Sequence, residues 1–260
     1  MKLYFRVAAR VGFATISLAF MVGCTTTSVL PTDDLNVANP WSTQSASASG
    51  PAVWQHQQFP GKRPNDYRYT RLDGRDAMLV RADASVSLLR QMVRVEPADL
   101  GRLNFSWKVP ALLPAADLRD RDLSDSPVRI VLAFEGDRSK FSARDAMLSE
   151  LAHALTGEPM PYATLMYVWC NYAAPGTVLH NNRTSRIRKL VMESGPGNLG
   201  QWQDYARDVR ADFERAYGEA PGALVSIGIM TDTDNTRSSS TAWYGPVRHV
   251  RAAQPARALP

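Results

Sequence analysis

Two loops of this chain carry short, oxygen-bearing side chains at a density that could bind an ion or act on a substrate. The first loop covers residues 117–127 and the second covers residues 231–236, and each lies beside an apolar stretch. The candidate residues are Asp125, Asp232, Asp234 and Asn235. Carboxylate and amide oxygens are ligands for hard cations, so a structural Ca²⁺ at Asp232 and Asp234 is one prediction.

The same loops allow two other interpretations. Asp and Asn often hydrogen-bond backbone groups in turns. This turn chemistry is favoured, because the glycine and distal glutamate of an EF-hand are missing and Arg119 and Arg121 neutralise much of the first loop. A third interpretation is an enzyme that cleaves glycosidic bonds, with Asp125 acting beside Asp232 or Asp234. Such carboxyl groups stand about 5–9.5 Å apart across the bond.

Aromatic side chains on the polar side of a sheet would indicate a sugar-binding surface, because flat rings stack on sugar rings. The candidates are Trp107, Tyr167, Trp169 and Tyr244. Trp107 and Trp169, however, share a face with apolar neighbours, and large aromatic residues in strands usually belong to the core. Core packing is therefore the favoured interpretation, and a ligand-binding surface is the alternative.

Signatures of several common enzyme and metal-binding classes are missing from the sequence. Residues 195–200 match G-x-G-x-x-G, but Pro196 removes a backbone donor and no βαβ pattern surrounds the motif, which favours a glycine-rich turn. The chain contains neither G-x-S-x-G nor H-E-x-x-H, and its four histidines show no ligand spacing. No catalytic motif is found, and no cofactor is expected beyond the Ca²⁺ considered above.

The first 24 residues have the layout of a bacterial export signal. Lys2, Arg6 and Arg10 form a basic flank, an apolar run follows from residue 11 to residue 22, and the run ends at Cys24. The apolar run is shorter than the roughly 20 residues that a spanning helix needs. The residues at 21–24 resemble a lipobox, which implies cleavage after residue 23 and acylation of Cys24. Thr25, in place of Asp, is typical of lipoproteins sent to the periplasmic face of the outer membrane.

Cleavage of this leader changes the charge and cysteine arguments. Residues 1–23 contain three basic residues and no acidic one, which leaves 27 basic and 25 acidic residues in the mature chain. This balance excludes the dense basic surface of a nucleic-acid-binding protein. Acylation of Cys24 would leave Cys170 without a disulfide partner, and strand alternation predicts a buried, inert thiol at Cys170.

The remaining chain divides by composition into a tether, a domain and a tail. Residues 24–51 are rich in Ser, Thr, Ala and Pro, which predicts a flexible tether after the lipidated cysteine. Residues 252–260 form a similar tail, and residues 52–251 are long enough for one well-buried domain.

Most of the domain alternates apolar and polar residues with a period of two, which predicts strands. The strand stretches are 77–81, 103–109, 128–134, 165–169, 187–192, 225–230 and 241–247. Helices are predicted from the cap at Ser142 to the stop at Gly157, and around Phe213 up to Gly218. Residues 202–208 fit either a strand or the second helix. The pattern predicts a mainly β fold, an antiparallel sandwich or barrel with one or two short helical insertions.

Several stretches resemble a bacterial group catalogued as domain-of-unknown-function family 3047. The most specific is Ile-Met-Thr-Asp-Thr-Asp-Asn-Thr at 229–236, followed by Ala-Trp-Tyr-Gly at 242–245. The other matching stretches are 59–62, 105–109, 125–130, 167–171, 200–202 and 207–213. The resemblance runs from about Trp54 to Val250, with residues 137–159 as an insertion and Pro246 in place of a family Asp. It implies a jelly-roll sandwich of the carbohydrate-binding kind and provides no catalytic residues.

Together these features predict an outer-membrane lipoprotein that faces the periplasm and is held in the bilayer through acylated Cys24. The leading hypothesis is a non-catalytic jelly-roll module that binds a glycan or another polymer. A carboxylate-dependent glycan-active enzyme and a non-catalytic envelope scaffold are the alternatives.

Overall fold

A computed structural model of the chain describes Trp41 and residues 54–252. The predicted leader at 1–23, Cys24, the tether apart from Trp41, and the tail from residue 253 lie outside the described residues. Within the described part, no helix is both long and apolar enough to cross a membrane.

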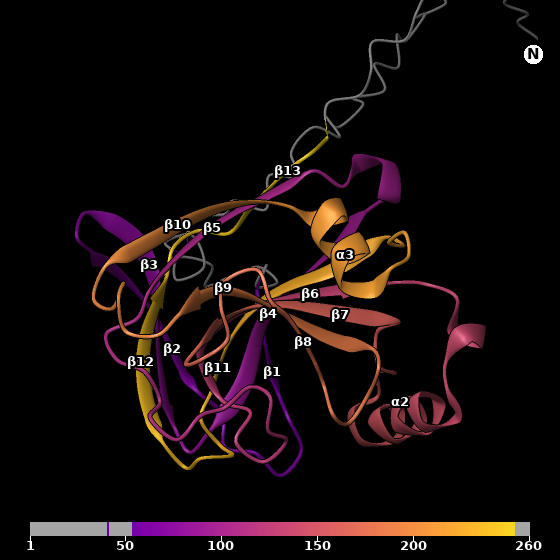
Figure 1. Cartoon of the computed structure of the whole chain (residues 1–260), viewed down its shortest axis with the longest axis horizontal. Coiled ribbons are helices and arrows are strands. Elements are labelled where there is room, and N and C mark those ends of the chain that lie inside the picture. Colours follow the sequence, from indigo (N-terminus) through magenta and orange to yellow (C-terminus); the bar gives the residue numbers. More distant parts are fainter. Residues whose placement is uncertain (1–40, 42–53, 253–260) are drawn as a thin grey trace, which may run out of the picture. The chain divides into compact units, whose positions relative to one another are not determined.

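The described chain forms two β-sheets that pack face to face as a jelly-roll-like sandwich (Figure 1). Sheet A has seven strands, which are in spatial order β1 (Gln55–Gln58), β4 (Val86–Val95), β11 (Leu224–Asp232), β6 (Ser126–Phe134), β7 (Ala163–Cys170), β9 (Ile187–Ser194) and β8 (Val178–His180). Sheet B consists of β10 (Trp202–Asp208), β5 (Arg102–Lys108), β12 (Ser239–Tyr244), β3 (Arg75–Asp83) and β2 (Asp66–Leu72), with β13 (Arg248–Val250) paired to β5. Neighbouring strands are antiparallel except β7 and β9, which are parallel. The mainly β prediction is confirmed.

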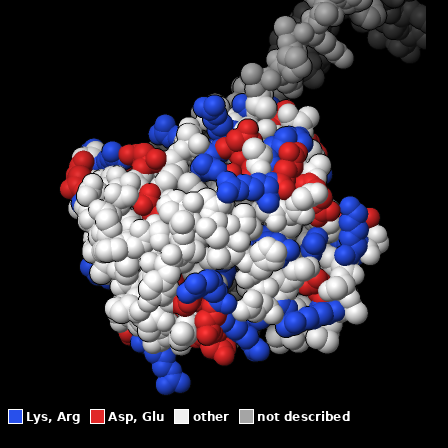
Figure 2. Space-filling view, viewed as in Figure 1, with Lys and Arg blue, Asp and Glu red and all other residues white. Residues whose placement is uncertain are grey.

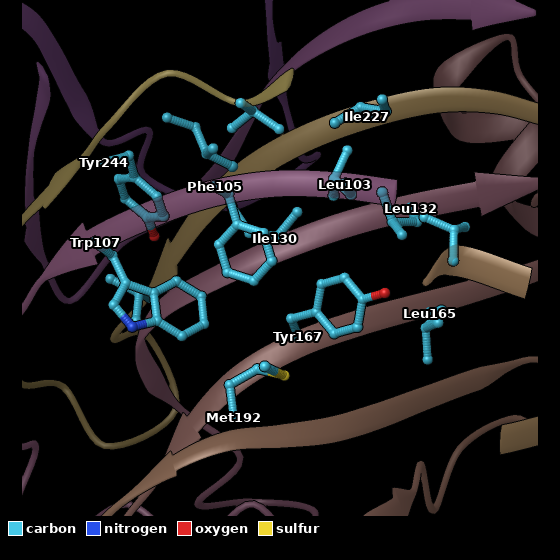
Figure 3. Close-up of a cluster of buried hydrophobic side chains, with 14 of the residues drawn as sticks. Leu103, Phe105, Trp107, Ile130, Leu132, Leu165, Tyr167, Met192, Ile227 and Tyr244 are labelled. Atoms are coloured by element: carbon cyan, nitrogen blue, oxygen red, sulfur yellow. The ribbon is translucent and has the colours of Figure 1, made fainter. Parts of the chain in front are cut away.

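The alternation read from the sequence determines which side chains lie between the sheets. Phe105 and Trp107 of β5 pack against Ile130 of β6 and Tyr167 of β7, with Tyr244 of β12 beside them (Figure 3). The rings of Phe105 and Tyr167 stack across the interface with their centroids 5.4 Å apart. This aromatic and aliphatic layer is the main core of the sandwich.

The outer face of sheet A, which points away from this core, is also apolar. Every residue of β6 and β7 is buried, on the outer face as well as on the core face. A second apolar cluster on this face includes Leu88, Val131, Met166, Val168 and Met230. Antiparallel sheets commonly leave one face polar and solvated, so this second apolar face requires a cover or a ligand.

Both predicted helices are present. Helix α2 (Ala143–Thr156) begins after its cap Ser142 and ends at Gly157, which is in the left-handed conformation that glycine adopts readily. Helix α3 (Val209–Tyr217) begins after Asp208, whose side chain accepts the N–H of Ala211, and ends at Gly218. The domain also contains two short 3₁₀ helices, η1 (Pro97–Asp99) and η2 (Arg138–Lys140).

The stretch 202–208, which the sequence left open, is strand β10 and pairs with β5 along its length. Sequence analysis missed β4, because its adjacent Leu88 and Leu89 interrupt the alternation. Residues 195–200 form a turn between β9 and β10, with positive φ at Gly195 and Gly200, as the glycine-rich turn prediction required. Cys170 is a buried thiol, as predicted.

One residue of the predicted tether belongs to the core. Trp41 is 1% exposed, and its ring centroid lies 4.7 Å from that of Trp54. Trp41, which lies within the predicted tether, therefore packs against Trp54, and the rest of that prediction concerns residues outside the described part. An indole buries far more apolar surface than the Ser, Thr and Ala residues around it, and composition averaged over the segment conceals this anchor.

The core assignment predicts that Trp169→Ala destabilises the fold strongly. Trp169 is 1% exposed and donates its indole N–H to the carbonyl of Gly195, 3.1 Å away. Truncation should lower the free energy of unfolding by about 3–5 kcal/mol in urea denaturation. The control Tyr172→Ala removes an aromatic ring that is 61% exposed and should cost less than about 1 kcal/mol. Equal losses in the two variants would contradict this assignment.

Candidate functional site

The structure brings together the three carboxylates that the sequence placed in two separate loops. Asp125 precedes β6, Asp232 ends β11, and Asp234 lies in the loop from β11 to β12. One oxygen of each carboxylate lies within 4.8 Å of the others. They meet because β6 and β11 are neighbours and pair through Ser126 and Asp232.

Asp125 organises the loop that follows β11. Its carboxylate accepts the backbone N–H of Thr236 at 2.7 Å, the hydroxyl of Thr236 at 2.6 Å and the backbone N–H of Asn235 at 3.3 Å. Asp125 is only 1% exposed. The donors that surround it belong to the protein's own turn, so its role here is to hold that turn.

Short-range turn chemistry also operates in the first acidic loop. Asp117 accepts the backbone N–H of Arg119 at 3.0 Å, and Asp120 accepts that of Asp122 at 2.7 Å. These are the local Asp-to-backbone bonds expected in turns. The turn interpretation is thus confirmed for this loop.

Three basic side chains lie among the three carboxylates. Arg129 of β6 forms an ion pair with Asp232 at 2.8 Å, and Lys62 forms one with Asp234. Lys189 of β9 is the third, and it is 2% exposed. Because Arg129 and Lys62 already pair with Asp232 and Asp234, a cation there would have to compete with them. The Ca²⁺ site stays a prediction.

Burial dominates the electrostatics of Asp232 and Lys189. Desolvation raises the pKa of Asp232 to about 8, although the nearby Arg129 acts in the opposite direction. Desolvation lowers the pKa of Lys189 to about 7, and repulsion from Arg129 adds to this shift. One oxygen of Asp232, Oδ1, has no hydrogen-bond partner within the part of the chain that the structure describes. Charged groups are disfavoured at this depth because they lose hydration.

Lys189 and Arg129 hold a loop against the outer face of sheet A. The Lys189 ammonium donates to the carbonyl of Leu118 at 3.1 Å and to the hydroxyl of Ser124 at 2.6 Å. Arg129 donates to the carbonyl of Ser124 at 2.6 Å. Leu118 itself packs into the apolar cluster on that face. The loop thus covers one end of the outer face, over the buried charges.

Sequence reasoning missed Lys189 and Arg129 as members of this cluster. The signal was present, because each stands within a strand among residues that alternate as apolar positions. Lys189 shares its side of β9 with Ile187 and Val191, and Arg129 shares its side of β6 with Val131. A charged residue at such a position is buried unless the strand lies at a surface. A buried charge requires polar partners.

The other end of the outer face forms a groove of about 1020 Å³. The floor comes from β4, β6, β7 and β11; most of its side chains are apolar, and Thr164 and Ser226 add hydroxyls. The apolar ones are Leu88, Met92, Val131, Ala133, Met166 and Met230. Helix α2 contributes Ala152 and Thr156 to a wall. Four charged residues at the rim form two ion pairs, Arg90 with Glu158 at 2.7 Å and Arg94 with Glu135 at 3.0 Å. Arg138 also lines the groove and donates to Ser149 and to the carbonyl of Met160.

None of the three clustered carboxylates lines this groove. The groove and the buried charges adjoin at Met166, whose sulfur lies 3.8 Å from a guanidinium nitrogen of Arg129. The geometry that motivated a glycosidase, in which Asp125 and Asp232 or Asp234 face a substrate across a shared cleft, is therefore not found in the described groove. The carboxylates contact protein groups instead.

The four candidate aromatic residues are core residues and present no ring to a ligand. Trp107, Tyr167 and Tyr244 are 0% exposed, and Trp169 is 1% exposed. Figure 3 shows the first three between the sheets. Tyr244 donates its hydroxyl to the carbonyl of Met230 at 2.7 Å, and Tyr167 donates to Asp212 at 2.9 Å. Alternation along their strands turns these side chains into the space between the two sheets. The core interpretation is therefore confirmed, and the ligand-binding interpretation is corrected for these four residues.

Comparisons with known proteins identify a family and a set of distant folds. The family model described as "Protein of unknown function (DUF3047)" matches residues 52–248. No curated protein matches the chain.

Three similar solved structures have TM-scores below 0.5 and so carry no information on a ligand. A family 11 carbohydrate-binding module of Clostridium thermocellum has a TM-score of 0.37 and 9% identity, and the match covers 81% of this chain and 94% of that one. The endoglucanase Cel12A of Rhodothermus marinus has a TM-score of 0.44 and 8% identity, and the match covers 77% of this chain and 92% of that one. The xyloglucanase domain of NopAA of Sinorhizobium fredii, in complex with cellobiose, has a TM-score of 0.42 and 8% identity, and the match covers 78% of this chain and 96% of that one.

The burial of Lys189 predicts how stability depends on pH. Because its pKa falls from 10.5 to about 7 on folding, the unfolded chain binds more protons than the native protein between these values. The Lys189 contribution to the free energy of unfolding therefore rises with pH across this window, by up to about 1.4 kcal/mol per pH unit. Urea denaturation at several pH values should show the stability difference between wild type and Lys189→Met changing across the window.

The matched control is Lys140→Met, whose side chain is 58% exposed. Its stability difference from wild type should stay constant over the same pH range. A constant difference for Lys189→Met as well would show that Lys189 keeps its proton when buried.

Proposed function

This chain belongs to the DUF3047 family of proteins of unknown function, and we propose that it is a non-catalytic, lipid-anchored envelope protein that binds the apolar chain of an amphiphilic ligand in the groove of sheet A. The observation that carries this proposal is the composition of the groove floor. Most of its floor side chains are aliphatic or thioether groups, three of them methionines, and the polar ones are Thr164 and Ser226. Flexible, polarizable methionines are typical of surfaces that adapt to apolar ligands.

The size and position of the groove support a ligand site. At about 1020 Å³ it lies at the upper end of the range of small-molecule sites, roughly 300–1,000 Å³. It occupies the part of an apolar sheet face that the loop held by Lys189 leaves uncovered. An acyl chain on this floor would remove apolar surface from water, at roughly 25 cal/mol per Å² of area buried.

A glycan or another polymer is the second candidate ligand, and the charged rim favours it. Arg90, Glu158, Arg94 and Glu135 could form hydrogen bonds with sugar hydroxyls. Against it, the four candidate rings lie in the core, although Phe59 and Tyr162 line the groove. Polysaccharide pull-down with the full chain tests this candidate directly.

The absence of catalysis is part of the proposal and rests on where the carboxylates lie. Glycoside cleavage requires two carboxyl groups on opposite sides of the scissile bond. Asp125 and Asp232 are buried, and Asp232 is paired with Arg129. Acidic residues at the groove rim, such as Glu158, are paired with arginines.

The proposed location rests on Cys24. An acylated Cys24 would hold the protein on a bilayer without a spanning helix, because each buried methylene contributes about 0.8 kcal/mol and more than one chain is attached. Thr25 supports the periplasmic face of the outer membrane as the destination.

Cys24→Ser should abolish acylation of the protein in the producing bacterium. Removing the sulfur removes the acylation site and the lipobox, so the chain should lose labelling by radioactive palmitate and keep its leader. Cys170→Ser, which changes a buried thiol, is the control and should leave both the label and leader cleavage unchanged. A Cys24→Ser protein that keeps its label and loses its leader would contradict the anchor.

Met92→Glu should weaken amphiphile binding in the groove. Met92 lines the groove and is 52% exposed, so a carboxylate there can stay hydrated in the free protein while it opposes an apolar ligand. Titration with a dansyl-labelled fatty acid should show at least a tenfold rise in Kd, which corresponds to about 1.4 kcal/mol.

Val250→Glu is the matched control, because Val250 is 47% exposed and lies on β13, outside the groove. It should bind the fatty acid like wild type. Equal binding by Met92→Glu and wild type would remove the groove as the site. Polysaccharide binding that Met92→Glu abolishes, without any fatty-acid binding, would assign the groove to a glycan.

A further inference from the structure

Helix α2 packs on the domain with its polar side inward. Its buried residues are Asp145 and Ser149. Asp145 accepts hydrogen bonds from the hydroxyls of Thr184 and Ser185, at 2.5 and 2.6 Å, and Ser149 accepts one from Arg138 at 2.9 Å. A surface helix normally buries its apolar stripe, so the orientation of α2 is the reverse of the usual one.

The apolar side chains of α2 consequently lie in solvent. Met147, Leu151 and Leu155 are 62%, 52% and 60% exposed. They are spaced four residues apart, so they lie above one another on one side of the helix and form what we call the α2 stripe. Contiguous apolar surface of this kind marks a binding site for a protein or a membrane.

The α2 stripe adjoins the groove. Ala152 and Thr156 line the groove wall, and each follows a stripe residue directly in sequence. Met92, at the groove floor, is also among the exposed large apolar residues. The stripe and the groove therefore lie on neighbouring sides of the same helix.

Basic residues without an ion pair flank the stripe. Arg144 lies three residues before Met147 and seven before Leu151, on the same side of the helix, and donates to the carbonyl of Asn182. Neither Arg144 nor Arg183, next to Asn182, belongs to any ion pair found among residues 54–252. Figure 2 shows basic side chains beside uncharged surface in the region of α2. Anionic headgroups complement this arrangement.

We propose that the α2 stripe docks on the surface of a lipid bilayer that contains anionic lipids and so places the groove at the source of its amphiphilic ligand. The inference rests on the proposed groove function. The apolar side chains would enter the headgroup and acyl boundary, as in helices that lie in the membrane interface, while Arg144 and Arg183 contact phosphates.

The length of chain before the domain also favours a bilayer over another partner. Trp41 is anchored in the core, and seventeen residue steps separate it from Cys24. An extended chain spans at most about 3.6 Å per residue, so an acylated Cys24 keeps the domain within about 60 Å of the membrane. At that distance the bilayer is the partner present at the highest effective concentration.

The test uses residues 24–260 with Cys24→Ser, the chain that remains after cleavage of the leader, so that neither an acyl chain nor the leader contributes to binding. Flotation is measured with vesicles of phosphatidylcholine alone and with vesicles that contain an equal share of phosphatidylglycerol. The unaltered stripe should bind the anionic vesicles. The triple variant Met147→Glu, Leu151→Glu, Leu155→Glu should bind them at least tenfold more weakly.

The matched control carries the same number of new carboxylates away from the stripe, as Ala146→Glu and His153→Glu on another side of α2 and Val250→Glu on β13. All three positions are exposed, so both triple variants should fold, which circular dichroism and thermal melting would verify. The control should keep at least half of the vesicle binding. Equal losses in the two triple variants would show a nonspecific effect of charge and overturn the proposal.

Fatty-acid titration in solution separates this inference from the groove proposal. Normal fatty-acid binding by the stripe variant, with vesicle binding lost, supports both. Fatty-acid binding by the parent chain without any vesicle binding overturns the docking inference alone, and loss of both activities in the parent overturns the groove as well. A dimer in sedimentation velocity that the stripe variant dissociates would reassign the stripe to a second copy.

Discussion

The organisation of this protein depends on a constraint at the centre of sheet A, where strands β6 and β7 are apolar on both faces. One face packs against sheet B in the sandwich core, which removes that face from water. The other would cost free energy if it remained in water, so it has to be covered or to bind something. The chain covers one end with the loop that contains Leu118 and leaves the other end as a groove. Both the buried charges and the candidate ligand site follow from this division.

The buried charges explain how a polar loop can cover an apolar face. Lys189 and Arg129 point out of the sheet and donate to Leu118 and Ser124 of the loop, while Asp232 balances Arg129. A buried charge is tolerated only when it is paired and hydrogen-bonded, and removing one partner leaves the other uncompensated. We interpret this cluster as the set of interactions that holds the loop on the outer face of sheet A. Its acidic residues interact with the loop and its turn rather than with a substrate.

The groove and helix α2 form a second functional unit on the same side of sheet A. The helix is attached by Asp145 and Ser149, so its leucines are free to contact something outside the protein. In a soluble domain such exposure carries an aggregation risk, which a bilayer partner would remove. An apolar stripe, an apolar groove and a proposed lipid anchor then share one type of partner, which the glycan hypothesis alone does not explain.

The sequence by itself determined the local features of this protein. Alternation placed most strands and assigned Trp107 and Trp169 to an apolar face, Ser142 and Gly157 marked both ends of α2, and the leader ending at Cys24 predicted export. These features depend on neighbours in sequence, which a pattern records. Only the tertiary structure decided that Asp125 meets Asp232, that Lys189 is buried, and that α2 faces its leucines outward. Periodicity tells which side chains share a face, but what covers that face is set by packing between segments far apart in the chain.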